Sequence, residues 1–281
     1  YPWNNYISIV YIKFNKKFNH HMDLKIKGKN AFITGATRGL GLASLKSLAN
    51  EGVNIAYCSR SEEGIQKVEK YLSKLNINSY GFVHEINNNN SNLDELVNKI
   101  DTNFGNVDIL VNNVGGSLGS SSLNNDTIET YQNVFDVNFW SSLKLMKIYS
   151  EKMVNAGWGR IINISSIFGR EYGGKSASYM ASKASLIAAT KHLSIDLADK
   201  GVTVNSIAPG SVKHEGGSWE KFVNNSSENE LEDFIKNNLP MKDFGTPEPI
   251  GDMVSFLSSP RSYLITGACI NIDGGQSSNL F

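Results

Sequence analysis

A tyrosine and a lysine four residues apart are the first side chains in this sequence whose types and spacing suggest chemistry. They are Tyr179 and Lys183, in the stretch SYMASKA, and their neighbours are small. Residues four apart lie on one face of a helix. An ammonium group near a phenol favours the phenolate, so the pKa of the tyrosine should fall from about 10 toward neutral pH. Such a group could give a proton to an oxygen atom or take one from it. The alternative is an ordinary surface pair, which by itself this spacing more often indicates.

A glycine-rich segment, TGATRGLG at residues 34–41, lies between a short apolar run and a helical pattern. Its glycines allow a sharp turn and a close approach of a phosphate to the backbone. The helix that follows offers free N–H groups and the positive end of its dipole to an anion. A tight turn without a ligand would use similar residues, and the spacing differs from the usual Gly-x-Gly-x-x-Gly fingerprint. Its position after the first strand favours a dinucleotide site.

The residues that follow the second apolar run bear on which dinucleotide binds. NAD-binding folds usually carry an acidic residue there, which accepts a hydrogen bond from the ribose 2′-hydroxyl. This chain has Ser59 and Arg60 at that point, and Arg38 lies within the glycine-rich segment. Two guanidinium groups and a serine hydroxyl suit a 2′-phosphate, so NADP(H) is predicted and NAD(H) is the less favoured cofactor. The alternative is that both arginines are ordinary surface residues.

The elements that must position these residues alternate along the chain. The apolar, strand-like runs are NAFITG, VNIAYCS, SYGFVHEI, VDILVNN, GRIINISS, VTVNSIAP and GACINIDGG, with helical patterns between them. Alternation with short, glycine-ended connections is typical of βαβ units. Continuous apolar strands indicate a sheet that is covered on both faces. The pattern predicts a single-domain α/β fold, a doubly wound parallel sheet (Rossmann fold) in three layers.

Length and composition argue against several classes of function. The chain has 281 residues, of which 40% are hydrophobic and 19% charged, and its formal net charge is zero. A zero net charge gives no electrostatic footprint of a protein that binds nucleic acid or a membrane surface. No apolar run approaches the ~18 residues that a membrane span needs. Cys58 and Cys269, both in apolar runs, are expected to be buried free thiols, which fits a cytoplasmic protein.

Residues 1–21, YPWNNYISIVYIKFNKKFNHH, differ from the rest of the chain. They are aromatic and basic, contain no acidic residue and precede the first methionine, Met22. One interpretation is an upstream extension with the natural start at Met22, and the other is the remnant of a basic targeting segment. The extension is favoured and is expected to be disordered, with one dinucleotide-binding domain over residues 22–281.

Five short motifs, TGATRGLG, NNVGG, NISS, YMASK and APGS, occur in this order, and with them the chain resembles the short-chain dehydrogenase/reductase family over nearly its whole length. The resemblance implies that Tyr179 is the catalytic acid–base and that Lys183 assists it and binds the nicotinamide ribose. It also implies that Ser166, rather than Ser165, holds the substrate carbonyl, and that Asn138 holds a water in a proton relay. Taken alone, the serine would be a helix cap and the asparagine a satisfied buried polar group.

The resemblance also implies which residues bind the cofactor besides the catalytic pair. They come from the glycine-rich segment and from the ends of later strands. They are Gly35, Thr37, Arg38, Gly39, Leu40, Gly41, Ser59, Arg60, Glu85, Ile86, Asn112, Asn113, Gly115, Pro209, Gly210 and Val212. The chain departs from the family at Val114, where alanine is usual, and at Glu85, where aspartate is usual.

A further departure lies in the segment predicted to close over the substrate, about residues 213–240. The family often has a threonine that bonds the nicotinamide carboxamide at the position of His214. His214 is therefore either a hydrogen-bonding partner in the site or an ordinary loop residue.

Two glycines, Gly216 and Gly217, are natural hinges for this segment. Trp219 is predicted to wall the substrate, with Phe222 and Val223 as further candidates. A plain amphipathic helix would show the same pattern. The remainder of the segment is polar and is expected to be irregular.

These features predict an oxidoreductase that moves a hydride between NADP(H) and a carbonyl/alcohol pair. The resemblance is to reductases of 3-oxoacyl thioesters, and a sugar, polyol or small-ketone dehydrogenase of the same family is the alternative. The alternative from another class is a catalytically silent NADP(H)-binding regulator, against which the complete Ser/Tyr/Lys set argues. No metal is expected, because no His/Cys/Asp cluster has ligand spacing. The resemblance further implies a homotetramer or homodimer, formed through long helices at about residues 127–155 and 176–200.

Overall fold

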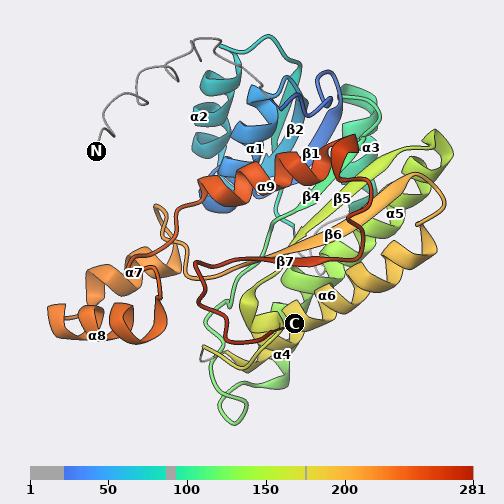
Figure 1. Ribbon diagram of the computed structural model, residues 1–281. Helices are drawn as coiled ribbons and strands as arrows, with labels where there is room; N and C mark the ends of the chain where they lie inside the picture. The colour runs from blue at the N-terminus through green and yellow to red at the C-terminus, as the bar shows by residue number, and fades with distance from the viewer. Residues whose placement is uncertain (1–21, 87–92, 175, 281) are drawn as a thin grey trace, which may run out of the picture.

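One parallel sheet organises the part of the chain that the structure, a computed structural model, describes, which is residues 22–86, 93–174 and 176–280 (Figure 1). The strands are β1 (Asn30–Thr34), β2 (Asn54–Ser59), β3 (Ser79–Val83), β4 (Ile109–Asn112), β5 (Gly159–Ile164), β6 (Val202–Pro209) and β7 (Cys269–Ile272). Their order is β3-β2-β1-β4-β5-β6-β7. The predicted extension at residues 1–21 lies outside the described residues.

The strand order confirms the doubly wound fold. The chain runs outward from β1 to β3, returns to pair β4 with β1, and then runs outward on the other side. This reversal creates a topological switch point between β1 and β4, where such sheets bind their ligands beyond the carboxyl ends of the strands. The glycine-rich segment follows β1 and therefore lies at this point.

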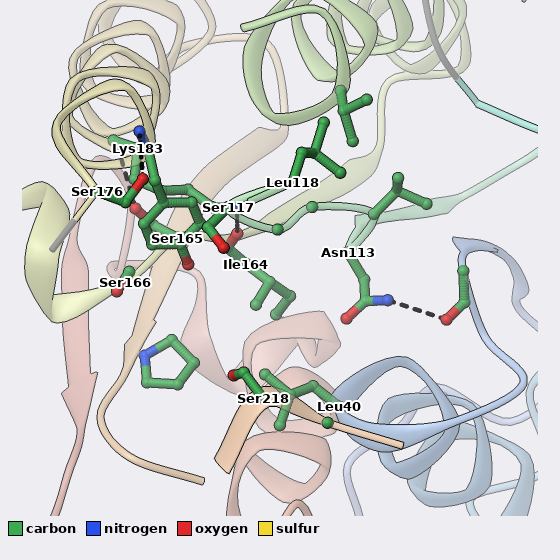
Figure 2. Close-up of a pocket in the computed structure, with 18 of the residues that line it drawn as sticks. Leu40, Asn113, Ser117, Leu118, Ile164, Ser165, Ser166, Ser176, Lys183 and Ser218 are labelled. Carbon is green, nitrogen blue, oxygen red and sulfur yellow. Dashed lines mark hydrogen bonds between the residues drawn. The ribbon is translucent and has the colours of Figure 1, made fainter. Parts of the chain in front are cut away.

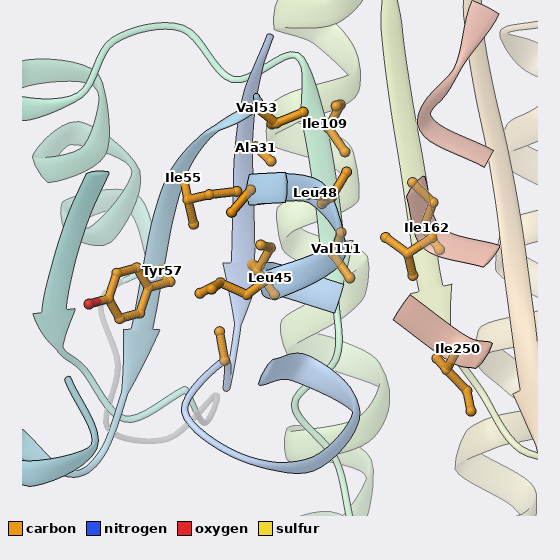
Figure 3. Packing of buried hydrophobic residues seen from close by; sticks show 14 of the residues in the cluster. Ala31, Leu45, Leu48, Val53, Ile55, Tyr57, Ile109, Val111, Ile162 and Ile250 are labelled. Atoms are coloured by element: carbon orange, nitrogen blue, oxygen red, sulfur yellow. The ribbon is translucent and has the colours of Figure 1, made fainter. Parts of the chain in front are cut away.

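Helices cover both faces of the sheet and give the predicted three layers. On one face lie α1 (Gly39–Asn50), α2 (Glu62–Leu72) and α9 (Glu248–Ser258), and on the other α3 (Leu93–Asn103), α5 (Ser141–Ala156) and α6 (Ala177–Asp196). Because successive strand residues point to opposite faces, Ile33 packs on the first layer and Phe32 on the second. Figure 3 shows the first core, where Leu45 and Leu48 of α1 meet Ile55 of β2.

The edge strand β7 is only half-buried along its length. Cys269 lies on it and shares this exposure, whereas Cys58 on β2 is buried, and both thiols are free. The expectation of two buried thiols is therefore wrong for Cys269, because an edge strand has a neighbour on one side only.

The segment after β6 is more regular than its polar sequence predicts. It contains two helices, α7 (Ser218–Asn225) and α8 (Glu228–Asn238), which project away from the sheet in Figure 1. A capping box begins α8: the Ser227 hydroxyl accepts from the Glu230 N–H, and the Glu230 carboxylate accepts from the Ser227 N–H at 2.9 Å. Neither helix has a fully buried residue.

An aromatic cluster of Trp219, Phe222, Phe234 and Phe244 joins these two helices to the loop that follows them. The ring centroids of Trp219 and Phe234 lie 5.1 Å apart, and those of Phe222 and Phe234 lie 4.9 Å apart. Phe244 stacks on Phe234 at 5.8 Å. Four aromatic rings supply enough apolar contact to hold two short polar helices together, which is why an irregular segment was the wrong expectation.

α1 and α9 approach each other closely at a glycine. A Cβ atom added to Gly251 would lie 2.5 Å from the carbonyl oxygen of Ala43 and 2.7 Å from its carbonyl carbon. Because both are backbone atoms, the helices would have to separate. We expect Gly251→Ala to lower the free energy of unfolding by about 1–3 kcal/mol, as overpacking usually does. Urea unfolding measures the change, with Gly116→Ala as the control because a Cβ there meets nothing within 4 Å; equal stability of the two variants would contradict the prediction.

Candidate active site

A cavity of about 1120 Å³ opens at the carboxyl ends of the strands. Figure 2 shows Ser166 and Lys183 toward one side of it and Leu40 and Asn113 toward the other. Most of the residues predicted for the site line this cavity. They are Gly35, Thr37, Arg38, Leu40, Ser59, Arg60, Glu85, Ile86, Asn113, Gly115, Ser166, Tyr179, Lys183, Pro209, Gly210, Val212, His214 and Trp219. The volume exceeds the ~300–1,000 Å³ typical of a drug-sized ligand site and suits a dinucleotide together with a substrate.

Tyr179 and Lys183 lie one turn apart near the start of α6, as their spacing predicts. The hydroxyl of Ser176 begins this helix by accepting a hydrogen bond from the Tyr179 backbone N–H at 3.3 Å. Lys183 is buried, and its ammonium donates to the carbonyl oxygen of Ile164 at 2.8 Å. The same ammonium lies 5.8 Å from the centroid of the Tyr179 ring.

Burial sets the acid–base properties of this pair. It raises the pKa of Tyr179 above its ordinary value, while a hydrogen bond with the Ser166 hydroxyl acts in the opposite direction. Burial also lowers the pKa of Lys183 to about 8. The predicted fall in the tyrosine pKa is therefore wrong for the protein alone, because the lost hydration of the phenolate outweighs the favourable interactions.

The two serines after β5 have different contacts. The Ser166 hydroxyl accepts a hydrogen bond from the Phe168 N–H at 3.2 Å and also bonds the Tyr179 side chain. The Ser165 hydroxyl instead donates to the backbone carbonyl of Lys183 at 3.2 Å. Only Ser166 therefore shares a hydrogen bond with the tyrosine, which supports its choice as the serine that would bind a substrate oxygen.

Asn138 lies in a π-helical turn, Asp136–Trp140, that joins α4 (Ile128–Phe135) to α5. The one helix expected at about residues 127–155 is therefore interrupted by this turn. Extra residues inserted as a π turn often mark a functional site, because they redirect a side chain without ending the helix.

The side chain of Asn138 is fully buried and bound to backbone groups. Its amide donates to the carbonyl oxygens of Gly116 and Val134, both at 2.8 Å, and its oxygen accepts from the Gly116 N–H at 2.9 Å. A Cβ on Gly115 would lie 2.6 Å from this oxygen and 2.9 Å from the Lys183 ammonium. Asn138 thus fixes the loop beside the lysine without lining the cavity, and its part in a proton relay stays a prediction.

The glycine-rich segment fits an anion at the start of α1. Gly35 and Gly39 adopt φ angles of 65° and 54°, which favour glycine. Arg38 is the N-cap residue but provides no side-chain hydrogen bond, and the first turn of α1 contains no acidic residue. The helix therefore has first-turn N–H groups that no side chain caps, next to a positive dipole end, as a phosphate requires.

Two predicted cofactor residues, Gly41 and Asn112, are engaged in packing and hydrogen bonds within the protein. A Cβ on Gly41 would lie 2.4 Å from the Asn113 amide nitrogen and from the Gly35 carbonyl oxygen, so Gly41 is needed for packing. The Asn112 amide donates to the Asn163 side-chain oxygen at 2.8 Å and is buried between β4 and β5. Neither Gly41 nor Asn112 lines the cavity. Their part in cofactor binding stays a prediction.

The two arginines predicted for a 2′-phosphate lie at one end of the cavity and are both engaged. Arg38 donates to the carbonyl oxygen of Gly216 at 2.7 Å, and Arg60 pairs with the Glu85 carboxylate at 3.6 Å. Between them, the hydroxyls of Thr37 and Ser59 lie 2.7 Å apart. This region can supply positive charge and hydroxyl donors to an anionic group, although Glu85 opposes part of that charge.

His214 lies against the glycine-rich segment. A Cβ on Gly39 would come within 2.7 Å of its ring. Its ring contact is thus with the start of α1, and no contact with Tyr179 or Ser166 is recorded among the described residues. His214 also lines the cavity, and its contact with the nicotinamide carboxamide stays a prediction.

Of the three residues predicted to wall the substrate, Trp219 lines the cavity, whereas Phe222 and Val223 do not. Phe222 packs inside the aromatic cluster. A contact between Trp219 and a substrate stays a prediction. Further residues that line the cavity carry no predicted role. They are Ser117, Leu118, Ser120, Thr130, Asn133, Phe168, Gly173, Gly174, Ser176 and Lys221. The glycine- and serine-rich composition of residues 115–122 was the available signal for some of them.

Comparisons with known proteins agree with this geometry. A protein-family model described as enoyl-(acyl carrier protein) reductase matches residues 35–277. The 3-oxoacyl-(acyl-carrier-protein) reductase FabG of Buchnera aphidicola subsp. Schizaphis graminum is 31% identical over 259 residues, which covers 90% of this chain and 99% of that protein.

Two solved structures share the fold. YwfH, an NADPH-dependent reductase involved in bacilysin biosynthesis, has a TM-score of 0.84 and 27% identity, and covers 90% of this chain and 100% of its own. L-sorbose reductase from Gluconobacter frateurii, solved with NADPH and L-sorbose, has a TM-score of 0.82 and 26% identity, and covers 92% and 100%.

The described part of the chain lacks two further features. No helix in this part of the chain has both the length and the apolar content to cross a bilayer. No group of three or more His, Cys, Asp or Glu side chains within it is arranged to hold a metal ion.

Proposed function

Because the chain belongs to the short-chain dehydrogenase/reductase family of oxidoreductases, we propose that it uses NADP(H) to reduce a carbonyl group or to oxidise the corresponding alcohol. The observation that carries the proposal is the meeting of Tyr179, Ser166 and Lys183 in the cavity that the glycine-rich segment also lines. Acid–base groups and a nucleotide-binding loop in one cavity are what hydride transfer to a carbonyl needs.

Each catalytic residue has a separate task in the proposed reaction. The nicotinamide supplies or accepts the hydride. Tyr179 gives the proton to the substrate oxygen during reduction and removes it during oxidation, and Ser166 donates a hydrogen bond to the same oxygen. Lys183 stabilises negative charge near the phenol while its ammonium is held by Ile164. Asn138 keeps the adjoining loop in place.

The positive end of the cavity supports NADP(H) as the cofactor. Arg38, Arg60, Ser59 and Thr37 line that end, and no acidic residue occupies the end of β2. The similar solved structures are those of an NADPH-dependent reductase and of a reductase bound to NADPH. The proposal includes that the protein uses NAD(H) less readily than NADP(H).

The proposed substrate is a 3-oxoacyl thioester. Support comes from the FabG relatives, which are named as reductases of 3-oxoacyl groups on acyl carrier protein. A sugar or small ketone is the second candidate, because the substrate end carries several hydroxyl side chains and the L-sorbose reductase shares the fold.

A binding experiment tests the cofactor proposal. Arg60→Ala should weaken NADPH binding by about tenfold, because one charge-assisted contact to the 2′-phosphate is lost, and should leave NADH binding within about twofold. Glu85→Gln is the matched variant: it removes the carboxylate that pairs with Arg60 and should tighten NADPH binding severalfold. Fluorescence titration of both cofactors measures these effects. Equal weakening of NADPH and NADH by Arg60→Ala would contradict the role of Arg60.

Two broader expectations are part of the proposal. Residues of about 213–240, with α7 and α8, are proposed to form a lid over the substrate. From the family resemblance, we propose that the chain forms a homodimer or homotetramer through α5 and α6. A cytoplasmic location is proposed on the same basis.

A further inference from the structure

The ring of His214 forms part of the cavity wall where α1 begins. It lies between two glycines: a Cβ on Gly39 would come within 2.7 Å of the ring, and one on Gly217 within 2.8 Å. Any other residue at either position would displace the imidazole. The chain therefore keeps space for this ring beside the first turn of α1, where no side chain caps the helix.

The turn that carries His214 is held in place from three sides. The Gly217 N–H donates to the His214 carbonyl oxygen at 3.0 Å. The Gly216 N–H donates to the Glu220 carboxylate at 2.7 Å. The Gly216 carbonyl accepts from the Arg38 guanidinium, also at 2.7 Å. Since Arg38 belongs to the glycine-rich segment, this last bond ties the turn directly to the loop below the ring.

One hydrogen bond fixes the tautomer of the neutral His214 ring. Its Nδ1 lies 3.0 Å from the carbonyl oxygen of Glu215. A carbonyl oxygen only accepts, so Nδ1 carries the proton. Nε2 then bears a lone pair in the neutral ring and an N–H in the protonated ring. The described residues offer Nε2 no recorded hydrogen-bond partner, so it is available to a ligand.

We propose that His214 is a ligand of the cofactor pyrophosphate and that it takes up a proton when the cofactor binds. The proposal rests on the proposed function, because it needs a dinucleotide whose phosphates lie at the start of α1. A lone pair on Nε2 repels a phosphate oxygen, whereas an N–H on the charged ring donates to it. The pyrophosphate therefore selects the imidazolium form, and binding draws one proton from solution at pH values where the free ring is neutral.

Charged groups of both signs surround the ring. Arg38 of the loop and Lys46 of α1 are positive, while Glu215 of the turn and Glu248 of α9 are negative, and all four share a hollow with His214. Glu220 lies in the first turn of α7, and Lys221 of the same helix lines the main cavity. Lys67 of α2 interacts electrostatically with Glu215. The positive and negative charges around His214 offset one another. Binding of the pyrophosphate therefore makes the largest change in the local charge around the ring.

The direction of the pH effect follows from this proton uptake. The bound state holds the proton more tightly than the free state, so the extra affinity is complete at low pH and is lost as the pH rises through the titration of the bound imidazole. The ionisation of a 2′-phosphate, near about pH 6, acts in the opposite direction, which the experiment must cancel.

The test is NADPH binding by the wild-type chain and by His214→Gln from pH 5.5 to 8.5. Glutamine keeps a donor of similar reach but does not titrate. Because both proteins bind the same ligand, the ratio of their dissociation constants cancels the 2′-phosphate term. We expect His214→Gln to bind about tenfold more weakly at pH 5.5 and within about twofold at pH 8.5. His192→Gln, at an exposed histidine on α6, is the control and should give a ratio near 1 throughout.

A second readout separates a phosphate ligand from a merely structural residue. The chain has five histidines, and the imidazole signal that disappears in His214→Gln identifies His214 by NMR. That signal should titrate at higher pH with NADPH bound than without it. A ratio that is constant with pH, or an NMR titration unmoved by NADPH, would overturn the proposal for His214 alone. Absence of any NADPH binding by the wild-type chain would overturn the proposed function and this proposal with it.

Discussion

Replacing Tyr179 with phenylalanine should lower the turnover number by about 10²–10⁴-fold, which is the usual contribution of a positioned general acid or base. The variant loses the one oxygen atom that can give a proton to the substrate, while the ring keeps its place on α6. NADPH affinity should change little, because the phosphate-binding region lies at the other end of the cavity. Steady-state kinetics on a panel of 3-oxoacyl thioesters, sugars and small ketones, together with NADPH titration, measure both quantities.

Tyr172→Phe provides a matched control for this substitution. Tyr172 lies between β5 and α6, only a few residues before Tyr179, but it is 92% exposed and does not line the cavity. Its replacement should leave turnover within about twofold of the wild-type value, as surface changes away from a site usually do. If Tyr179→Phe retained full turnover, the proposed mechanism would fail. A wild-type chain that bound NADPH but turned over no carbonyl would favour the silent regulator instead.

The raised pKa of Tyr179 also sets the pH dependence of the two directions. Reduction needs the protonated phenol, so burial extends the pH range over which Tyr179 is ready to donate. Oxidation needs the phenolate and should become faster as the pH rises. In the protein without bound cofactor, burial thus favours the protonated phenol, which is the form that the proposed reduction uses.

Replacing Lys183 with methionine should have opposite effects on activity and stability. Activity should fall by about 10²–10³-fold, as when one preorganised charge or donor is removed from a site. Stability should rise, because burial lowers the pKa of Lys183 from 10.5 to about 8, which corresponds to a cost of roughly 3 kcal/mol at neutral pH. Ile164 loses its hydrogen bond in the variant, which leaves a net gain of about 1–2 kcal/mol.

The stability gain should depend on pH in a defined direction. The folded-state pKa of Lys183 lies below its unfolded value, so the cost of the buried charge is complete below about pH 8 and disappears as the pH rises toward 10.5. The difference in melting temperature between wild type and Lys183→Met should shrink over the same range. Lys191→Met, at an exposed lysine on the same helix, should show neither effect. A destabilised Lys183→Met at pH 7 would mean that the hydrogen bond to Ile164 outweighs the cost of burial.

The sequence patterns predicted the sheet well because its strands are short, apolar and separated by glycine-ended helices. The same reasoning failed where tertiary contacts decide the outcome. Asn112 and Asn113 are adjacent, yet strand alternation turns the first toward Asn163 and the second toward the glycine-rich segment. The pKa of Tyr179 depends on how much water its hydroxyl loses, which spacing along a helix does not reveal.

The helices after β6 illustrate a second limit. Trp219 and Phe222 were visible as a pair, but Phe234 and Phe244 lie far along a polar segment and gave no periodic signal. Only the folded chain brings the four rings together. The position of His214 could not be predicted for the same reason, since its neighbour Gly39 lies 175 residues earlier in the sequence.

The aromatic cluster makes α7 and α8 a small unit with an apolar centre of its own. These helices hold one another, bury no residue completely, and leave the sheet through Gly216 and Gly217 at one end and Gly245 at the other. Such a unit can be exchanged between relatives, or altered by mutation, with little strain on the domain that carries the catalytic residues. If α7 and α8 form the proposed lid, substrate preference would diverge along this branch of the chain while the hydride-transfer chemistry is inherited unchanged.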